Sequence, residues 1–182
     1  VLYRLLNNLS FSLSTDGSIN TMNANMADFA HPTRYSWLTA IAGKYVNEWF
    51  TLSASALATV INEQADKGGS AGNHRKLTPY VSATFKPFRN EEFRVRFFYK
   101  DIFRLPSFND LYYQEVGNSK LKPENARQYN IGLTYSRNVC TFLPYLSATV
   151  DAYYNKVTDK IIAYPTKNLA VWSMRNLGSV EI

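Results

Sequence analysis

The chain has 182 residues and a formal net charge of +6, with 46% hydrophobic and 19% charged residues. This composition excludes a disordered chain, because enough apolar surface is available to bury. The lysines and arginines are spread along the chain and form no dense cluster, so nucleic acid is not an expected partner.

Apolar and polar residues alternate with a period of two, which predicts strands with two different faces. The stretch 127–136 is the clearest, whereas 34–46 alternates poorly and is assigned partly by its position. The sequence thus predicts an all-β fold of about eight strands without a helix. In chain order, the expected strands lie near 5–13, 34–46, 50–61, 80–86, 93–100, 127–136 and 144–157, and from about 171 onward.

The connections between these strands alternate in length. We expect long connections at about 15–33, 62–74, 102–126 and 158–170, and short ones at 47–48, 88–90 and 137–142. In an antiparallel up-and-down sheet, alternate connections lie at opposite ends. All the long loops would then share one end, which is typical of a transmembrane β-barrel with short periplasmic turns and long external loops.

Other side chains bear on this prediction. The polar faces carry Arg94, Arg96, Lys100 and Asp151, which suits either solvent or a water-filled lumen. Aromatic residues flank the short connections, as in the girdle of a membrane barrel, although β-propensity explains part of this. They are Tyr45, Trp49, Phe50, Phe85, Phe88, Phe93, Tyr135 and Phe142.

The sequence offers little for catalysis or metal binding. Cys140 is the single cysteine, so no internal disulfide is possible, and the two histidines, His31 and His74, are expected in loops. No nucleophile has a neighbouring base, and no Cys/His group has metal-site spacing. We therefore expect neither an enzyme nor a bound cofactor or metal.

Four segments resemble characteristic blocks of TonB-dependent outer-membrane receptors, in the order and spacing of that family. They are "FRLP" at 103–106, "GNSKLKPENARQYNIGL" at 117–133, "DAYYNKVTDKI" at 151–161 and "NLGSVEI" at 176–182. We refer to them as segments one to four. Leu105 replaces the usual alanine of segment one, and Asn-Ser-Lys-Leu at 118–121 replaces Asn-Pro-Asn-Leu. Residues 1–100 match mainly in their rhythm of strands and loops.

The resemblance implies a roughly 22-stranded barrel that encloses a plug domain. Residues 1–182 would be a run of later barrel strands, without the plug and the closing strands. It further implies the outer membrane of a Gram-negative bacterium, lipid around the barrel, and a TonB complex that acts through the plug. The chain begins without methionine or a signal peptide, so a piece of a longer protein is expected.

The loop at 102–126 contains the candidate site residues. Arg104 and Glu124 are expected to face each other on neighbouring strands, either as a clamp on the loop or as ligand contacts. Asp110, Tyr112, Tyr113 and Gln114 are the candidate ligand contacts, because tyrosine combines an apolar ring with a hydrogen-bonding group. The resemblance assigns structural roles to Phe103, Arg104, Pro106, Asn118, Leu121, Pro123 and Glu124.

The expected function is uptake of a scarce nutrient, most directly a ferric siderophore or similar iron chelate. Cobalamin, peptides and glycans remain open. Haem is less favoured, because haem receptors of this family carry a histidine between segments one and two, and none lies between Phe103 and Leu121; an external His31 or His74 leaves it open. The alternatives are a small outer-membrane barrel with a structural or adhesive role, and a soluble β-sandwich that binds a ligand.

Overall fold

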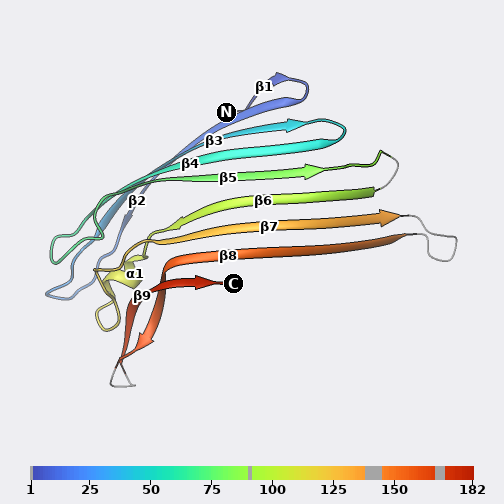
Figure 1. Ribbon diagram of the computed structural model, residues 1–182. Helices are drawn as coiled ribbons and strands as arrows, with labels where there is room; N and C mark the ends of the chain where they lie inside the picture. Colours follow the sequence, from blue (N-terminus) through green and yellow to red (C-terminus); the bar gives the residue numbers. More distant parts are fainter. Residues whose placement is uncertain (1, 90–91, 138–144, 167–170) are drawn as a thin grey trace.

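The strands form a single antiparallel sheet, and the order of strands in the sheet follows their order in the chain (Figure 1). The computed structural model describes residues 2–89, 92–137, 145–166 and 171–182. The strands are β1 (Leu2–Leu6), β2 (Leu9–Thr21), β3 (Thr33–Val46), β4 (Phe50–Gln64), β5 (His74–Phe85), β6 (Glu92–Arg104), β7 (Glu124–Arg137), β8 (Leu146–Pro165) and β9 (Trp172–Glu181). A short helix, α1 (Phe108–Tyr112), lies between β6 and β7.

This topology confirms the predicted all-β, up-and-down architecture. Every neighbouring pair is antiparallel, and within the described ranges β1 and β9 are the two open edges of one sheet. A two-sheet sandwich is therefore excluded for these residues, and so is a small barrel closed by them alone. None of the helical segments among the described residues is long and apolar enough to cross a membrane.

The two faces of the sheet differ in polarity, as the alternation predicted. One face exposes large apolar side chains, and the strand register joins them across the sheet, as where Phe97 pairs with Ile131 and Ile131 with Ala152. The other face has polar rows such as Lys44, Ser53 and Ser82. Exposed apolar surface of this extent marks a face that contacts lipid or another apolar partner.

On the polar face, Gly132 of β7 leaves room for an ion pair between the two strands on either side of it. Arg96 on β6, Gly132 on β7 and Asp151 on β8 lie in one row. The guanidinium of Arg96 lies 3.1 Å from the Asp151 carboxylate, and the two side chains meet over Gly132. A Cβ atom at Gly132 would collide with both of them.

We expect Gly132→Ala to separate Arg96 from Asp151 at small cost. The colliding atoms are the ends of half-exposed side chains, and such a pair contributes about 0–1 kcal/mol. The thermal unfolding midpoint of the intact parent protein should therefore shift little. Gly178→Ala, which meets nothing within 4 Å, is the control. A loss above about 2 kcal/mol would contradict this account, because it would require strain in the β7 backbone.

Several predicted boundaries were wrong. The first expected strand is two strands, β1 and β2, joined at Asn7 and Asn8, so the described sheet has nine strands. Strand β2 continues to Thr21 through polar residues, because Trp37 of β3 packs over Gly17 and the backbone pairing persists. Strand β5 begins at His74 rather than near Tyr80, so His74 opens a strand and only His31 lies in a loop.

The largest boundary error concerns β8, which continues to Pro165 beyond the predicted end at 157. Asp159 has a φ of 54°, but the register of β8 with β9 is the same on both sides of it, with Thr158 opposite Ser179 and Lys160 opposite Leu177. Three polar residues at 158–160 are followed by an apolar run at 161–164, and this absence of alternation hid the second half of the strand. The last connection is therefore only 166–171, and the strict alternation of long and short connections does not hold there.

The turn end of the sheet is the side where aromatic residues were predicted to gather. Tyr45, Trp49, Phe85 and Phe88 are exposed there, and the rings of Phe88 and Phe93 lie 6.0 Å apart. This arrangement fits the predicted girdle. Cys140 and Phe142 lie outside the described residues.

Candidate ligand-binding surface at the long-loop end

Helix α1 folds locally, contrary to the prediction of no helix. Ser107 caps its start: the Asp110 N–H donates to the Ser107 hydroxyl, and the Ser107 N–H donates to the Asp110 carboxylate. This is a capping box, and its Ser-x-x-Asp spacing was visible in the sequence. A single helical turn is too short to show a helical period, which is why alternation missed it.

The rest of this loop closes tightly onto α1. The N–H of Gly117 donates to the Tyr113 carbonyl at 2.6 Å, and the N–H of Asn118 donates to the Asp110 carbonyl at 2.8 Å. Leu111 and Leu121 are buried against Ile161 of β8. The segment from Leu105 to Pro123, called the α1 loop below, is thus a packed structure and not an open coil.

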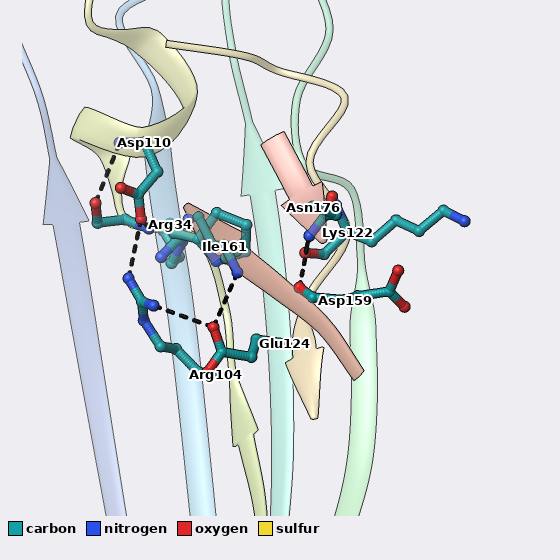
Figure 2. Close-up of polar contacts among 10 residues, drawn as sticks. Arg34, Arg104, Asp110, Lys122, Glu124, Asp159, Ile161 and Asn176 are labelled. Carbon is teal, nitrogen blue, oxygen red and sulfur yellow. Dashed lines mark hydrogen bonds and ion pairs between the residues drawn. The ribbon is translucent and has the colours of Figure 1, made fainter. Parts of the chain in front are cut away.

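Segments one to three meet at the base of the α1 loop (Figure 2). Arg104 and Glu124 pair in the register of β6 and β7, with 3.3 Å between their charged atoms, as the sequence predicted. Arg104 also lies 3.3 Å from the Asp110 carboxylate. Glu124 accepts a second hydrogen bond, at 3.0 Å, from the N–H of Ile161 in β8.

Segment four joins the same point through Asn176 of β9 (Figure 2). The Asn176 amide donates to the carbonyls of Lys122 and Asp159 and accepts from the Lys122 N–H at 2.8 Å. The Asn176 side chain therefore connects segment two, at Lys122, and segment three, at Asp159, to segment four. All four segments that resemble the family therefore meet at this joint, although they lie far apart in the sequence.

We expect Glu124→Ala to disturb this joint more than Arg104→Ala. Glu124→Ala removes the acceptor of the Ile161 N–H. Because Ile161 is buried, this unpaired N–H lowers the free energy of unfolding by about 1–3 kcal/mol. Arg104 is half exposed, so its ion pairs contribute about 0–1 kcal/mol. Hydrogen exchange of residues 158–165 in the intact parent measures the difference. The opposite order would contradict the assignment.

A second polar cluster, which sequence reasoning missed, holds the α1 loop against β3 and β4. The carboxylate of Glu63 accepts from the Arg34 guanidinium at 2.6 Å, from the Ala71 N–H at 3.1 Å and from the Tyr112 hydroxyl. Arg34 also donates to the Pro106 carbonyl at 2.8 Å. We call Arg34, Glu63 and Tyr112 the Glu63 cluster.

The sequence held a signal for this cluster. The turn predicted at Asn47 and Glu48 marks the hairpin, and with the register that the structure shows, Val46 opposite Thr51, counting back pairs Arg34 with Glu63. The two residues share the polar face, so opposite charges meet there. Tyr112 could not be placed in this way, because a loop has no register.

Burial and the neighbouring Glu63 carboxylate raise the pKa of the Tyr112 hydroxyl above its ordinary value. Tyr112 therefore stays protonated and donates to Glu63 throughout the physiological range. Because its pKa is higher in the docked loop than in a free loop, the contact is fully present below a pH of about 10 and weakens as the pH rises beyond it.

A hollow of about 290 Å³ lies between three connections at this end of the sheet. Its walls come from β2–β3, from β4–β5 and from the α1 loop. Its polar lining includes Asp28, Lys67, Tyr112, Tyr113, Gln114 and Ser119, and its apolar lining includes Met26, Phe29 and Leu111. The first two connections are joined by the Asp66 N–H, which donates to the Ala30 carbonyl at 2.8 Å.

The structure separates the predicted ligand contacts into two groups. Tyr113 and Gln114 are exposed and line the hollow. Tyr112 lines it too, but its hydroxyl is bound to Glu63. The Asp110 carboxylate caps α1 and pairs with Arg104, and Asp110 does not line the hollow. Tyr113 and Gln114 are therefore the predicted residues best placed to meet a ligand.

The remaining segment residues lie inside the loop framework. Pro106 and Leu121 are buried, and Asn118 donates to the Met174 carbonyl at 3.0 Å. Phe103 lies beside the ring of His74. Pro123 immediately precedes β7 and its carbonyl accepts from Asn125. No group of metal-binding side chains is assembled within the described ranges.

Comparisons with known proteins agree with this architecture. The family model "TonB dependent receptor-like, beta-barrel" matches residues 5–182. A vitamin B12 transporter, BtuB, of Vibrio vulnificus (strain YJ016) is 27% identical over 93% of this chain and 32% of the relative. The vitamin B12 transporter BtuB of Photobacterium profundum is 31% identical over 44% of this chain and 13% of the relative.

The solved structure of the FrpB iron transporter from Neisseria meningitidis (F3-3 variant) has the same fold. It superposes with a TM-score of 0.70 at 14% identity, covering 99% of this chain and 30% of that one. The chain thus spans about a third or less of the length of each of these proteins. From the family match across nearly its whole length, the chain belongs to the TonB-dependent receptors and is part of their β-barrel.

Proposed function

We propose that the parent protein is a transporter, and not an enzyme, in the outer membrane of a Gram-negative bacterium. Residues 1–182 would supply consecutive strands of its barrel wall and part of its external ligand-gathering surface. A plug domain, a TonB complex and surrounding lipid would be its other partners. The family match over residues 5–182 carries this proposal, and the apolar outer face of the sheet supports it.

The nutrient we propose is a metal ion held in a bulky organic chelator. The hollow supports this class, because both apolar and hydrogen-bonding groups line it, and Tyr113 and Gln114 are exposed to contact such a ligand. Within this class, a ferric siderophore matches the tyrosine-rich loop. Cobalamin is the second candidate, since both curated relatives are named vitamin B12 transporters.

Uptake by the intact parent protein tests the proposal. Cells that lack its gene would be offered cyanocobalamin, ferrichrome, a ferric catecholate and haemin in turn, each as the limiting source of its nutrient. Loss of growth on one compound, restored by the parent gene, would identify the cargo. Normal growth on all four would overturn the metal-chelate proposal and direct the search to peptides and glycans.

A variant pair connects the cargo to the hollow. Tyr113→Ala removes an exposed ring from the hollow, and we expect uptake of the identified compound to need a higher concentration. Tyr145→Ala is the matched control, because Tyr145 is also exposed but lies at the turn end before β8. Equal uptake by both variants would remove the hollow as the ligand site.

A further inference from the structure

We propose that Glu63 is the positioning residue of the candidate ligand surface, where its buried carboxylate holds two of the three walls of the hollow in place before a ligand arrives. This inference rests on the proposed function and names the side chain that prepares the site. Glu63 lies on β4 and does not itself line the hollow.

The contacts of Glu63 account for both walls. One carboxylate oxygen accepts from the Ala71 N–H, in the β4–β5 connection that supplies Lys67 to the hollow. The same oxygen accepts from the Tyr112 hydroxyl, in the α1 loop that supplies Tyr113 and Gln114. The two walls therefore meet at one atom, Oε1 of Glu63.

The second carboxylate oxygen of Glu63, Oε2, binds the counter-charge that a buried carboxylate requires. The Glu63 side chain has no exposed surface, and a lone buried carboxylate is strongly unfavourable. Arg34 compensates it with two nitrogens at 2.6 and 2.7 Å. Arg34 in turn holds the α1 loop, because it donates to the Pro106 carbonyl and lies 4.7 Å from the ring centre of Phe108.

The side-chain contacts of the Glu63 cluster can be lost without breaking the backbone pairing of the sheet. Strands β3 and β4 are paired along their whole length by backbone register, from Thr33 with Gln64 to Val46 with Thr51. Loss of the Glu63 carboxylate would leave this ladder in place and release only the two connections. A positioning role therefore predicts changed loops and changed ligand affinity on an intact barrel.

Glu63→Gln in the intact parent protein is the test, since glutamine keeps the size but replaces one oxygen with an NH₂ donor. That donor must face either the Arg34 guanidinium or the Ala71 N–H, which are donors themselves. Tyr112→Phe removes a single hydroxyl from the same oxygen. Glu48→Gln is the matched control, because Glu48 lies at the turn end of the same hairpin and is exposed.

The first readout is hydrogen exchange without ligand. In Glu63→Gln, amides of residues 65–73 and 105–123 should exchange at least about tenfold faster, whereas β3 and β4 keep their protection. Tyr112→Phe should affect only 105–123, and Glu48→Gln neither segment. Unchanged exchange of both loops in Glu63→Gln would overturn the proposal, and so would loss of protection throughout the sheet.

The second readout is the concentration dependence of uptake of whichever of cyanocobalamin, ferrichrome, a ferric catecholate or haemin the wild type imports. Glu63→Gln should raise the KM severalfold and leave the maximal rate unchanged, and an unchanged KM would overturn the positioning role. If the wild type imports none of these compounds, the proposed function fails, and the exchange experiment still decides whether Glu63 holds the walls.

Discussion

Replacing Arg34 by alanine should release the α1 loop from β3 and β4. The Glu63 carboxylate would remain buried without its counter-charge, which costs about 3–5 kcal/mol. The Pro106 carbonyl would lose its donor, and Phe108 would lose the guanidinium that packs on its ring. The loop can relieve this cost by moving away and admitting water to Glu63, so we expect local opening of the loop while the barrel stays folded.

Protease cleavage within residues 105–123 of the intact parent measures this opening. Arg34→Ala should be cut much faster than the wild type, and Arg34→Lys should be intermediate, because lysine keeps the charge but not the planar fork that reaches Glu63 and Pro106 together. Arg89→Ala is the control, since Arg89 forms an exposed ion pair with Glu48 at the turn end. Wild-type resistance in Arg34→Ala would contradict this role.

A double variant sharpens the test. In Arg34→Ala combined with Glu63→Ala, no uncompensated charge remains. The free-energy cost of the double variant should therefore be less than the sum of the costs of the two single variants. Additive costs would mean that the two side chains act independently, which their 2.6 Å contact does not allow.

Gly117→Ala is expected to prevent the α1 loop from closing. A Cβ atom at Gly117 would lie 2.6 Å from both the nitrogen and the carbonyl oxygen of Tyr113, and 2.9 Å from the carbonyl carbon of Leu111. These are backbone atoms of α1 and its C-cap, so no side-chain rotation can relieve the collision. Overpacking of this kind costs about 1–3 kcal/mol or more.

The consequence of Gly117→Ala should appear in two measurements on the intact parent. Amide exchange within 105–123 should rise, because the Gly117 and Asn118 hydrogen bonds to α1 would be lost. Uptake should fall, because Tyr113 would no longer stand at the hollow. Gly178→Ala, with open space around it, should behave as the wild type in both. Normal exchange in Gly117→Ala would show that the loop tolerates a wider turn.

Comparison with Gly132 shows why the neighbouring atoms decide such effects. A Cβ atom at Gly132 also collides with its surroundings, but there the colliding atoms end two flexible, half-exposed side chains. They can swing away from the sheet at small cost. At Gly117 the neighbours are backbone atoms with hydrogen bonds of their own, and moving them would break α1.

Much of the fold could be predicted from the sequence because alternation is a local property. The period of two in β7 and the first half of β8 placed each side chain on its correct face, and the spacing of turns indicated an up-and-down sheet. The contact between Arg104 and Glu124 followed from the same parity, since both lie on the polar face at the ends of paired strands. The same reasoning failed where polar and apolar residues do not alternate, as at 158–164 in β8.

The candidate site depended more on how the chain folds in space. The residue pattern alone was enough to predict most of the strands, their two faces, the loop end that gathers polar and aromatic residues, and the segments typical of the family. It could not predict that Asp110 faces Arg104, that Tyr112 reaches Glu63, or that Asn176 joins three segments. Strand register relates distant residues by simple counting, whereas a loop side chain finds its partner through the three-dimensional path of the loop.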